Sequence, residues 1–409
     1  MKYNTHVLGN GLRVIHLESA SPVVYCGYAV GAGTRDELPG EEGLAHFCEH
    51  TTFKGTARRT SLQILNCLER VGGDLNAFTN KEDTVFHAAI LREHLPRAVD
   101  LLSDIVLHST YPQAEVEKEI EVVCDEIECY NDSPAELIYD HFENIVFAGH
   151  PLGHNILGTQ ERLRRYTQAD PQRFTGRHYR PENAVFFAYG DISFSRLVRL
   201  LEKATAGFHP ASPLTEKRRA GAVPGYTPRE EVTSRGTHQA HVMIGNRAYD
   251  VHDRRRFALY LMNNILGGPG MNARLNIALR EKHGLVYTVD SSMVSYSDTG
   301  LWCVYFGCDP HDVKKCRRLV MRELDRMAQK PLSPAALAAA KRQIKGQIGV
   351  ACDNRESFAL DFGRSYLHHG IEKDVARLMA RVDEVTAEDM RTVAQEVFNP
   401  DRLTTLMFV

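Results

Sequence analysis

Hydrophobic and polar residues follow two kinds of pattern along the first half of the chain. Short apolar or alternating runs predict β-strands at residues 12–17, 23–30 and 84–90. Longer segments, in which apolar residues recur every three or four positions, predict helices at 42–53, 61–71, 95–107, 113–130 and 193–204. This mixture of strands and helices predicts an α+β fold.

The second half of the chain repeats this order of elements. Residues 208–228 are rich in Pro, Gly, Ala and charge and have little periodicity, which is typical of a linker. After them the pattern predicts a strand at 239–244, helices at 255–266 and 272–282, and strands at 285–294 and 300–307. An ungapped overlay of ILNCLERVGGDLNAFT on LNIALREKHGLVYTVD aligns Gly73 with Gly284 and Asn76 with Tyr287. We therefore predict two homologous domains, 1–207 and 229–409, joined by a linker at 208–228.

Composition excludes some classes of function. The formal net charge is −3, so the chain lacks the strongly basic balance typical of proteins that bind nucleic acid or anionic membranes. No apolar run approaches the length of about twenty residues that a membrane span needs, and the start MKYNTHVLGNGLRVIHLES lacks the apolar core of a signal peptide. Its nine cysteines have no paired spacing and are interpreted as reduced. Together these features predict a cytoplasmic protein.

The segment GLAHFCEHTTFKGT holds candidate chemistry in one predicted helix. His46 and His50 are four positions apart, so they share one helix face and can bind one metal ion, although two such histidines are also common as structural or exposed residues. Glu49 lies between them, where a carboxylate can take a proton from the attacking water and pass it to the leaving amine. This spacing is HxxEH, the reversed form of the HExxH zinc signature. The overlay places Phe257, Tyr260 and Leu261 at the equivalent positions of the second half, so only the first half is expected to bind a metal.

A catalytic zinc usually has three protein ligands and one open position, so a third ligand is needed. In AEVEKEIEVVCDEIECYND, Glu119 and Glu126 are two helical turns apart and border the apolar stripe. Burial of two carboxylates is costly unless a cation compensates, and a divalent ion would do so. From the residues alone, either glutamate can be the ligand, and a salt bridge to a lysine is a purely structural alternative.

Several segments resemble the inverzincin metallopeptidases, the pitrilysin and insulinase family that includes the mitochondrial processing peptidase. The resemblance covers essentially the whole chain and is carried by NGLRVIHLES, GAGTRDELPGEEGLAHFCEHTTFKGT, GGDLNAFTNKEDTVF, YRPENAVFFAYGDI and REKHGLVYTV. It implies two homologous domains, each a mostly antiparallel sheet flanked by helices. It also implies one zinc ion per chain, with Glu126 as the third ligand and Glu119 as a supporting carboxylate.

The family also brings an Arg and a Tyr, seven positions apart, from its second domain to the substrate. Arg280 and Tyr287 match this pair, and the resemblance implies that they bind substrate carbonyls and neutralise oxyanion charge. Without the resemblance, a surface Arg and a core Tyr would be the simpler interpretation. Asn76 and Ala77 match the family's edge strand, which pairs with an extended peptide, although Asn76 can also be read as a polar residue at a turn.

These features predict a zinc-dependent endopeptidase that hydrolyses short or unfolded polypeptides. Family members of this length form their chamber from two chains, so the resemblance implies a homodimer. A leader-sequence processing peptidase is one alternative, with the same chemistry and a different substrate. A non-catalytic scaffold or binding subunit of the same fold is another, and the presence of His46, Glu49, His50 and Glu126 argues against it.

Overall fold

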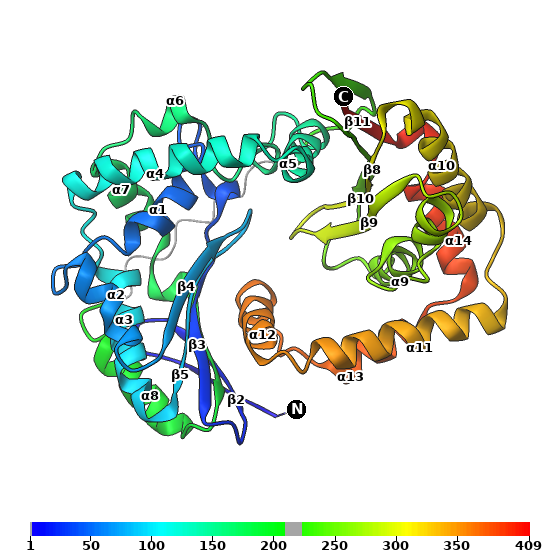
Figure 1. Cartoon of the computed structure of the whole chain (residues 1–409). Coiled ribbons are helices and arrows are strands. Elements are labelled where there is room, and N and C mark those ends of the chain that lie inside the picture. Colours follow the sequence, from blue (N-terminus) through cyan, green and yellow to red (C-terminus); the bar gives the residue numbers. More distant parts are fainter. Residues whose placement is uncertain (1, 209–222) are drawn as a thin grey trace. The chain divides into compact units, whose positions relative to one another are not determined.

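The computed structural model describes residues 2–208 and 223–409, which divide into two compact units (Figure 1). Each unit is built from non-contiguous parts of the chain. Unit 1 contains the described residues of Met1–Glu128, His154–Gly221 and Ala351–Asp374. Unit 2 contains those of Cys129–Gly153, Ala222–Val350 and Val375–Val409. Most of the predicted linker, at 209–222, lies outside the described residues.

Unit 1 is organised around a six-stranded sheet with the strand order β1-β2-β6-β3-β5-β4. The strands are β1 (Tyr3–Val7), β2 (Arg13–Glu18), β3 (Val23–Val30), β4 (Asp74–Thr79), β5 (Thr84–Leu91) and β6 (Ala184–Gly190). Neighbours are antiparallel except β2 and β6, which are parallel. The strand β4 is at an edge and pairs only with β5, so one side of its backbone has no partner strand in the sheet.

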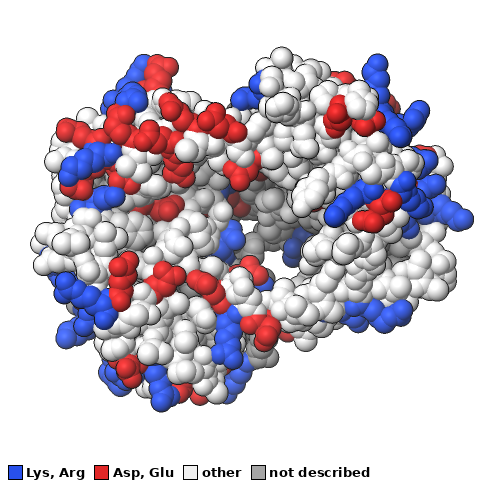
Figure 2. All heavy atoms as spheres, in the orientation of Figure 1, with Lys and Arg blue, Asp and Glu red and all other residues white. Residues whose placement is uncertain are grey.

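Two sets of helices cover opposite faces of this sheet. One set comprises α1 (Leu44–Thr52), α2 (Ser61–Glu69), α3 (Leu95–His108), α4 (Gln113–Asn131), α6 (Gln160–Leu163), α7 (Ala169–His178) and α8 (Phe194–Ala204). Their apolar residues and those of the central strands form one buried cluster that includes Tyr28, Phe47, Phe86 and Leu102. On the other face lies α12 (Arg355–His369), as Figure 1 shows. Most α4 carboxylates face solvent, and Figure 2 shows acidic side chains gathered over this helix.

The helix α12 comes from the second half of the sequence but packs on the sheet of unit 1. Phe358 and Phe362 contact the ring of Tyr189 edge-on, with centroid separations of 6.1 and 6.3 Å. Arg13 donates to the carbonyls of Tyr366 and Leu367 at 3.0 and 3.1 Å, which satisfies carbonyl groups at the end of the helix. The unit is therefore completed by a helix that follows β6 by more than one hundred residues.

Unit 2 has a five-stranded sheet with the order β7-β11-β8-β10-β9. Its strands are β7 (Glu230–Thr233), β8 (Ala240–Ala248), β9 (Val286–Ser295), β10 (Gly300–Cys308) and β11 (Thr404–Phe408). The pair β7 and β11 is parallel and the other neighbours are antiparallel, which repeats the pattern β2-β6-β3-β5-β4 of unit 1. The predicted α+β class, with two similar and mostly antiparallel sheets, is confirmed.

The helices of unit 2 are α5 (Pro134–Val146), α9 (Arg256–Gly267), α10 (Val313–Gln329), α11 (Pro334–Ala351), α13 (Val375–Glu384) and α14 (Ala387–Val397). The helix α5 comes from the first half of the sequence, yet its Leu137, Ile138 and Phe142 share a core with strands β8, β10 and β11. Each of these two helices, α5 and α12, therefore packs on the sheet formed by the other half of the sequence. The boundaries 1–207 and 229–409 stay a prediction about the division of the sequence.

Most element boundaries agree with the predicted ones to within two residues, and two elements differ more. The strand predicted at 239–244 extends to Ala248 as β8. The helix predicted at 272–282 is replaced by a shorter π-helix, Asn276–Glu281. Its hydrogen bonds join residues five positions apart, as where the amide of Lys282 donates to the carbonyl of Ile277 at 3.0 Å. Among the described residues, no helix is long and apolar enough to cross a membrane. The cytoplasmic location stays a prediction from the sequence.

Candidate metal centre

The helix α1 presents His46, Glu49 and His50 from a buried position. It begins after Gly43, whose φ of 88° favours glycine and where a Cβ would come within 2.6 Å of the Leu157 carbonyl. The Glu37 carboxylate accepts hydrogen bonds from the amides of Gly43 and Ala45 at 3.2 and 2.8 Å, and so caps the start of the helix. The backbone that carries the two histidines is therefore fixed at its first turn.

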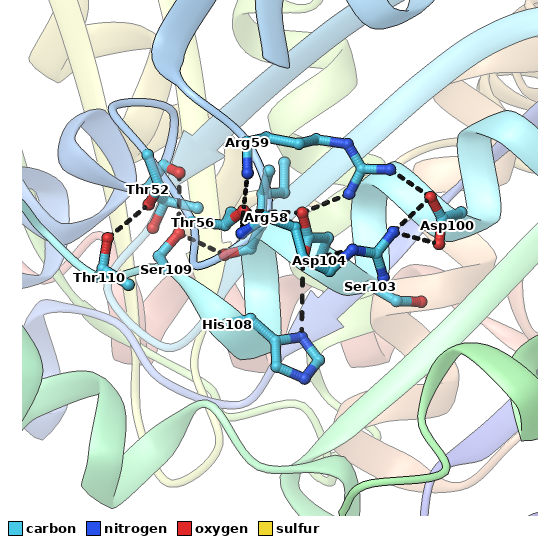
Figure 3. A network of polar contacts seen from close by, with 12 residues as sticks. Thr52, Thr56, Arg58, Arg59, Asp100, Ser103, Asp104, His108, Ser109 and Thr110 are labelled. Atoms are coloured by element: carbon cyan, nitrogen blue, oxygen red, sulfur yellow. Dashed lines mark hydrogen bonds and ion pairs between the residues drawn. The ribbon is translucent and has the colours of Figure 1, made fainter. Parts of the chain in front are cut away.

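The segment that follows α1 is fixed to α3 by a polar network (Figure 3). Asp104 of α3 is 1% exposed and accepts hydrogen bonds from Arg59 and, at 2.8 Å, from the Thr56 hydroxyl. Arg58 forms two hydrogen bonds with Asp100 at 2.8 and 2.9 Å. Because these contacts join residues 56–59 to the core helix α3, both ends of α1 are held in place.

The helix α4 brings Glu126 to the two histidines. Its Oε1 lies 3.9 Å from Nε2 of His46 and its Oε2 lies 3.5 Å from Nε2 of His50. One ligand atom from each residue lies within 4.8 Å of the others, and the imidazole centroids are 4.5 Å apart. Ligand atoms around a tetrahedral zinc ion are about 3.3 Å apart, given metal–ligand bonds near 2 Å. The three side chains would therefore fit a zinc ion if their ligand atoms moved slightly closer together.

Glu119 lies beside this cluster in a different role from Glu126. Nδ1 of His50 donates to Oε1 of Glu119 at 2.9 Å, and Nζ of Lys54 is 2.6 Å from Oε2. Both carboxylate oxygens of Glu119 are therefore engaged away from the Nε2 atoms. The contact with Nδ1 fixes the tautomer of His50 that leaves its Nε2 lone pair free for a metal.

The pKa values of the two histidines are shifted in opposite directions. Burial, followed by the nearby His50, lowers the pKa of His46 to about 3, so its imidazole is neutral at ordinary pH and can act as a ligand. Burial also lowers the pKa of His50, but the hydrogen bond to Glu119 and the surrounding carboxylates outweigh it and raise that pKa overall. Burial raises the pKa of Glu119, while His50 and Lys54 reverse this and hold it below its ordinary value. Because a histidine ligand must be neutral, zinc binding would favour the unprotonated form of both imidazoles.

Glu49 is placed as a buried carboxylate next to the ligand cluster. It is 8% exposed, and burial raises its pKa above the ordinary value. The Thr79 hydroxyl donates to its Oε2 at 2.6 Å. Of the three carboxylates at this site, Glu119 is paired with Lys54, and a divalent cation would balance the charge of Glu49 and Glu126.

Lys54 and Thr79 were not among the residues predicted for the site. Lys54 follows His50 by four positions but lies beyond the end of α1, so helical spacing alone does not place it in the site. No local signal identifies Thr79, because its approach to Glu49 depends on how β4 lies against α1.

Asn76 and Ala77 lie in the middle of the edge strand β4, as expected of residues that could border an extended peptide. Asn76 is therefore a strand residue and not a turn residue. Its Oδ1 accepts a hydrogen bond from the amide of Ala77 at 2.8 Å. The unpaired side of β4 leaves backbone groups available for an added strand.

Arg280 and Tyr287 belong to unit 2, where Arg280 is in the π-helix and Tyr287 is in the edge strand β9. The Arg280 guanidinium carbon is 5.6 Å from the centroid of the Tyr287 ring. Tyr287 is 81% exposed, so the simpler interpretation of it as a core residue is wrong. The two side chains form an exposed cationic and phenolic pair suited to carbonyl oxygens.

Comparisons with protein families match both halves of the chain. Residues 13–160 match the model described as insulinase (peptidase family M16), and residues 165–344 match the model described as peptidase M16 inactive domain. The proposed metal ligands fall in the first match, and Arg280 and Tyr287 fall in the second.

Curated relatives span almost the entire chain. An uncharacterized zinc protease of Streptomyces coelicolor is 33% identical over 95% of this chain and 86% of its own length. A zinc protease of Bacillus subtilis, also uncharacterized, is 30% identical over 96% of this chain and 95% of its own length. The beta subunit of the bovine mitochondrial-processing peptidase is 31% identical over 94% of this chain and 80% of its own length.

Two solved structures share the fold over the full chain. A protease from Helicobacter pylori has a TM-score of 0.91 at 21% identity and covers 100% of this chain and 99% of its own. A peptidase M16 inactive domain from Pseudomonas fluorescens has a TM-score of 0.90 at 20% identity, with 100% and 98% coverage. At these identities the likeness shows the fold alone.

Proposed function

The chain belongs to the insulinase family, peptidase family M16, and we propose that it is a zinc-dependent endopeptidase. The observation that carries this proposal is the convergence of His46, His50 and Glu126, with Glu49 buried beside them. Two imidazoles and one carboxylate form a common ligand set of catalytic zinc, which leaves a fourth position open. Relatives named zinc proteases support the choice of metal. The cluster of His46, His50 and Glu126 among the described residues corresponds to one ion per chain.

Each side chain of the centre has a separate role in this proposal. His46 and His50 bind through Nε2, while Glu119 orients His50 and is itself held by Lys54. A bound zinc ion would supply Lewis-acid polarisation and a nucleophile at neutral pH. Glu49 accepts a proton from the attacking water and returns it to the leaving amine. Its burial raises its pKa, which suits a group that must alternate between the two protonation states.

For the substrate, we propose short or unfolded polypeptides that bind as an added strand. The free edge of β4 supports this, since backbone hydrogen bonding accepts many side chains. Arg280 and Tyr287 would bind substrate carbonyls and stabilise the oxyanion. A homodimer that encloses the substrate is part of the same proposal and follows from the family resemblance.

Replacement of Arg280 by Ala is expected to reduce kcat/KM about 10²-fold with zinc content unchanged, because a donor to the developing oxyanion is lost. Steady-state hydrolysis of a quenched fluorescent peptide measures the first quantity and elemental analysis the second. Arg318 is an exposed arginine of the same unit, so Arg318→Ala is the matched control. An unchanged rate in Arg280→Ala would assign Arg280 to the surface without a role in substrate binding.

A processing peptidase that removes leader sequences is the second candidate. The similarity to the beta subunit of the bovine mitochondrial-processing peptidase favours it. Both candidates use the same chemistry, so substrate preference separates them. Cleavage of a mixed peptide library at many unrelated sites supports the general endopeptidase, and cleavage only near the amino termini of precursors supports the processing enzyme.

Metal removal tests the proposed function directly. Purified protein is expected to contain one zinc ion per chain and to lose peptide hydrolysis after treatment with a chelator, because the ligands remain but the Lewis acid is gone. Addition of zinc should restore the rate. Absence of bound metal after incubation with zinc would contradict the proposal and favour a non-catalytic subunit. Hydrolysis that persists without metal would contradict the assigned site.

A further inference from the structure

Thr79 is the last residue of β4, and its side chain reaches the carboxylate of Glu49. The two residues are nearly buried, with exposed fractions of 9% and 8%. The hydroxyl of Thr79 donates to Oε2 of Glu49 at 2.6 Å, which is typical of a hydrogen bond between a hydroxyl and a charged carboxylate. Among the described residues, Thr79 provides the side-chain donor to this carboxylate.

The Thr79 hydroxyl has two neighbouring acceptors, the Glu49 carboxylate and the hydroxyl of Thr84. Thr84 is the cross-strand partner of Thr79 in the β4–β5 ladder, and their hydroxyl oxygens are 3.5 Å apart. The Thr84 hydroxyl donates to the carbonyl of Ala32 at 2.9 Å, so its single proton is already used. Thr84 can therefore only accept from Thr79, at the long distance of 3.5 Å, whereas the carboxylate of Glu49, which has no proton to donate, accepts at 2.6 Å. The Thr79 proton thus goes to Glu49.

The backbone that carries Thr79 is fixed by the turn between β4 and β5. In this turn, Asp83 is 1% exposed and accepts hydrogen bonds from Arg364 at 3.0 Å and from His368 at 2.7 Å, both on α12. The Asn80 amide group also donates to Asp83 at 2.7 Å. Thr79 is thus held in register with Glu49 by contacts that lie outside the metal centre.

We propose that Thr79 is a positioning residue for Glu49, an inference that rests on the proposed function. Terminal torsions of glutamate are broad, so an unrestrained carboxylate samples many orientations. A hydrogen bond to Oε2 fixes the plane of the carboxylate and leaves Oε1 for proton transfer. A base must lie within hydrogen-bond reach of the proton it removes, so this orientation affects the rate of the chemical step.

The experiment compares Thr79→Val, which removes the hydroxyl at nearly constant shape, with Thr79→Ser, which retains it. Thr79→Val is expected to lower kcat roughly 10- to 100-fold with KM and zinc content unchanged. Thr79→Ser should restore most of the rate. Thr51→Val is the matched control. Thr51 is buried in α1, the helix that carries Glu49, and among the described residues its hydroxyl donates to the helix carbonyls of Phe47 and Cys48 and not to Glu49.

Two further measurements separate positioning from a general structural effect. In the Glu49→Gln background, Thr79→Val should cause no additional loss, since the hydroxyl acts through Glu49. A crystal structure of zinc-loaded Thr79→Val should show the Glu49 carboxylate turned from its orientation in the wild type. This second measurement does not depend on activity, so it decides the role of Thr79 even if the zinc-loaded wild type proves inactive and the proposed function fails.

Three results would overturn the inference. One is a wild-type kcat in Thr79→Val. Another is an equal loss in Thr79→Val and Thr79→Ser, which would show that packing of the methyl group matters and the hydroxyl does not. The third is an unchanged, singly oriented carboxylate in the variant crystal structure.

Discussion

The Glu49→Gln variant is expected to retain zinc and to hydrolyse peptides about 10²- to 10⁴-fold more slowly than the wild type, the range typical of a lost general base. An amide has nearly the shape of a carboxylate and keeps an acceptor for the Thr79 hydroxyl, but it cannot take a proton from water. His46, His50 and Glu126 are untouched, so coordination should persist. Single-turnover and steady-state rates measured with equal zinc occupancy test this expectation.

The control for this variant is Glu69→Gln. Glu69 is an exposed glutamate at the end of α2, so the same chemical change away from the metal centre should leave the rate unaltered. A Glu49→Gln protein that turns over like the wild type would rule out Glu49 as the base. A variant that loses zinc as well as activity would instead assign Glu49 to metal binding.

Replacement of Glu126 by Ala is expected to weaken zinc binding by at least about 10²-fold, because a charged ligand is removed from a three-ligand site. The Glu126 side chain is 43% exposed, so its loss leaves little buried volume unfilled and the fold should survive. Competition with a chromophoric chelator measures the affinity, and circular dichroism confirms that the protein remains folded.

Glu119 provides the comparison that identifies the third ligand. Glu119→Gln should weaken zinc binding less, about 10- to 100-fold, since it orients His50 without facing the Nε2 atoms. Glu117→Ala, an exposed change on the same α4, should have no effect. If Glu126→Ala kept full affinity and Glu119→Gln lost it, the roles of the two glutamates would have to be exchanged.

Helical periodicity was sufficient to place His46, Glu49 and His50 on one face, because the relation is local to α1. Periodicity did not distinguish Glu119 from Glu126 as the third ligand, because both border the buried stripe of α4. The family resemblance identified Glu126 as the third metal ligand. The geometry shows a physical distinction, because Lys54 and Nδ1 of His50 occupy both oxygens of Glu119. That distinction depends on how α1 and α4 pack and has no local signature.

The overall class was also predictable, since strand and helix periodicities and an internal repeat follow directly from the order of residues. The packing of α5 and α12 was not. Each helix has an apolar face that any sheet could cover, and periodicity does not say which sheet it is. Thr79 was missed for a similar reason, because its contact with Glu49 joins a strand to a helix far away in sequence.

The placement of α12 limits how this protein can be divided. A gene fragment that encodes only residues 1–208 would produce a sheet whose aromatic face, including Phe187 and Tyr189, lacks the covering residues Phe358 and Phe362. Such a fragment would expose an apolar patch prone to aggregation. Shortened versions for structural or biochemical work should therefore keep both halves of the gene, either fused or co-expressed.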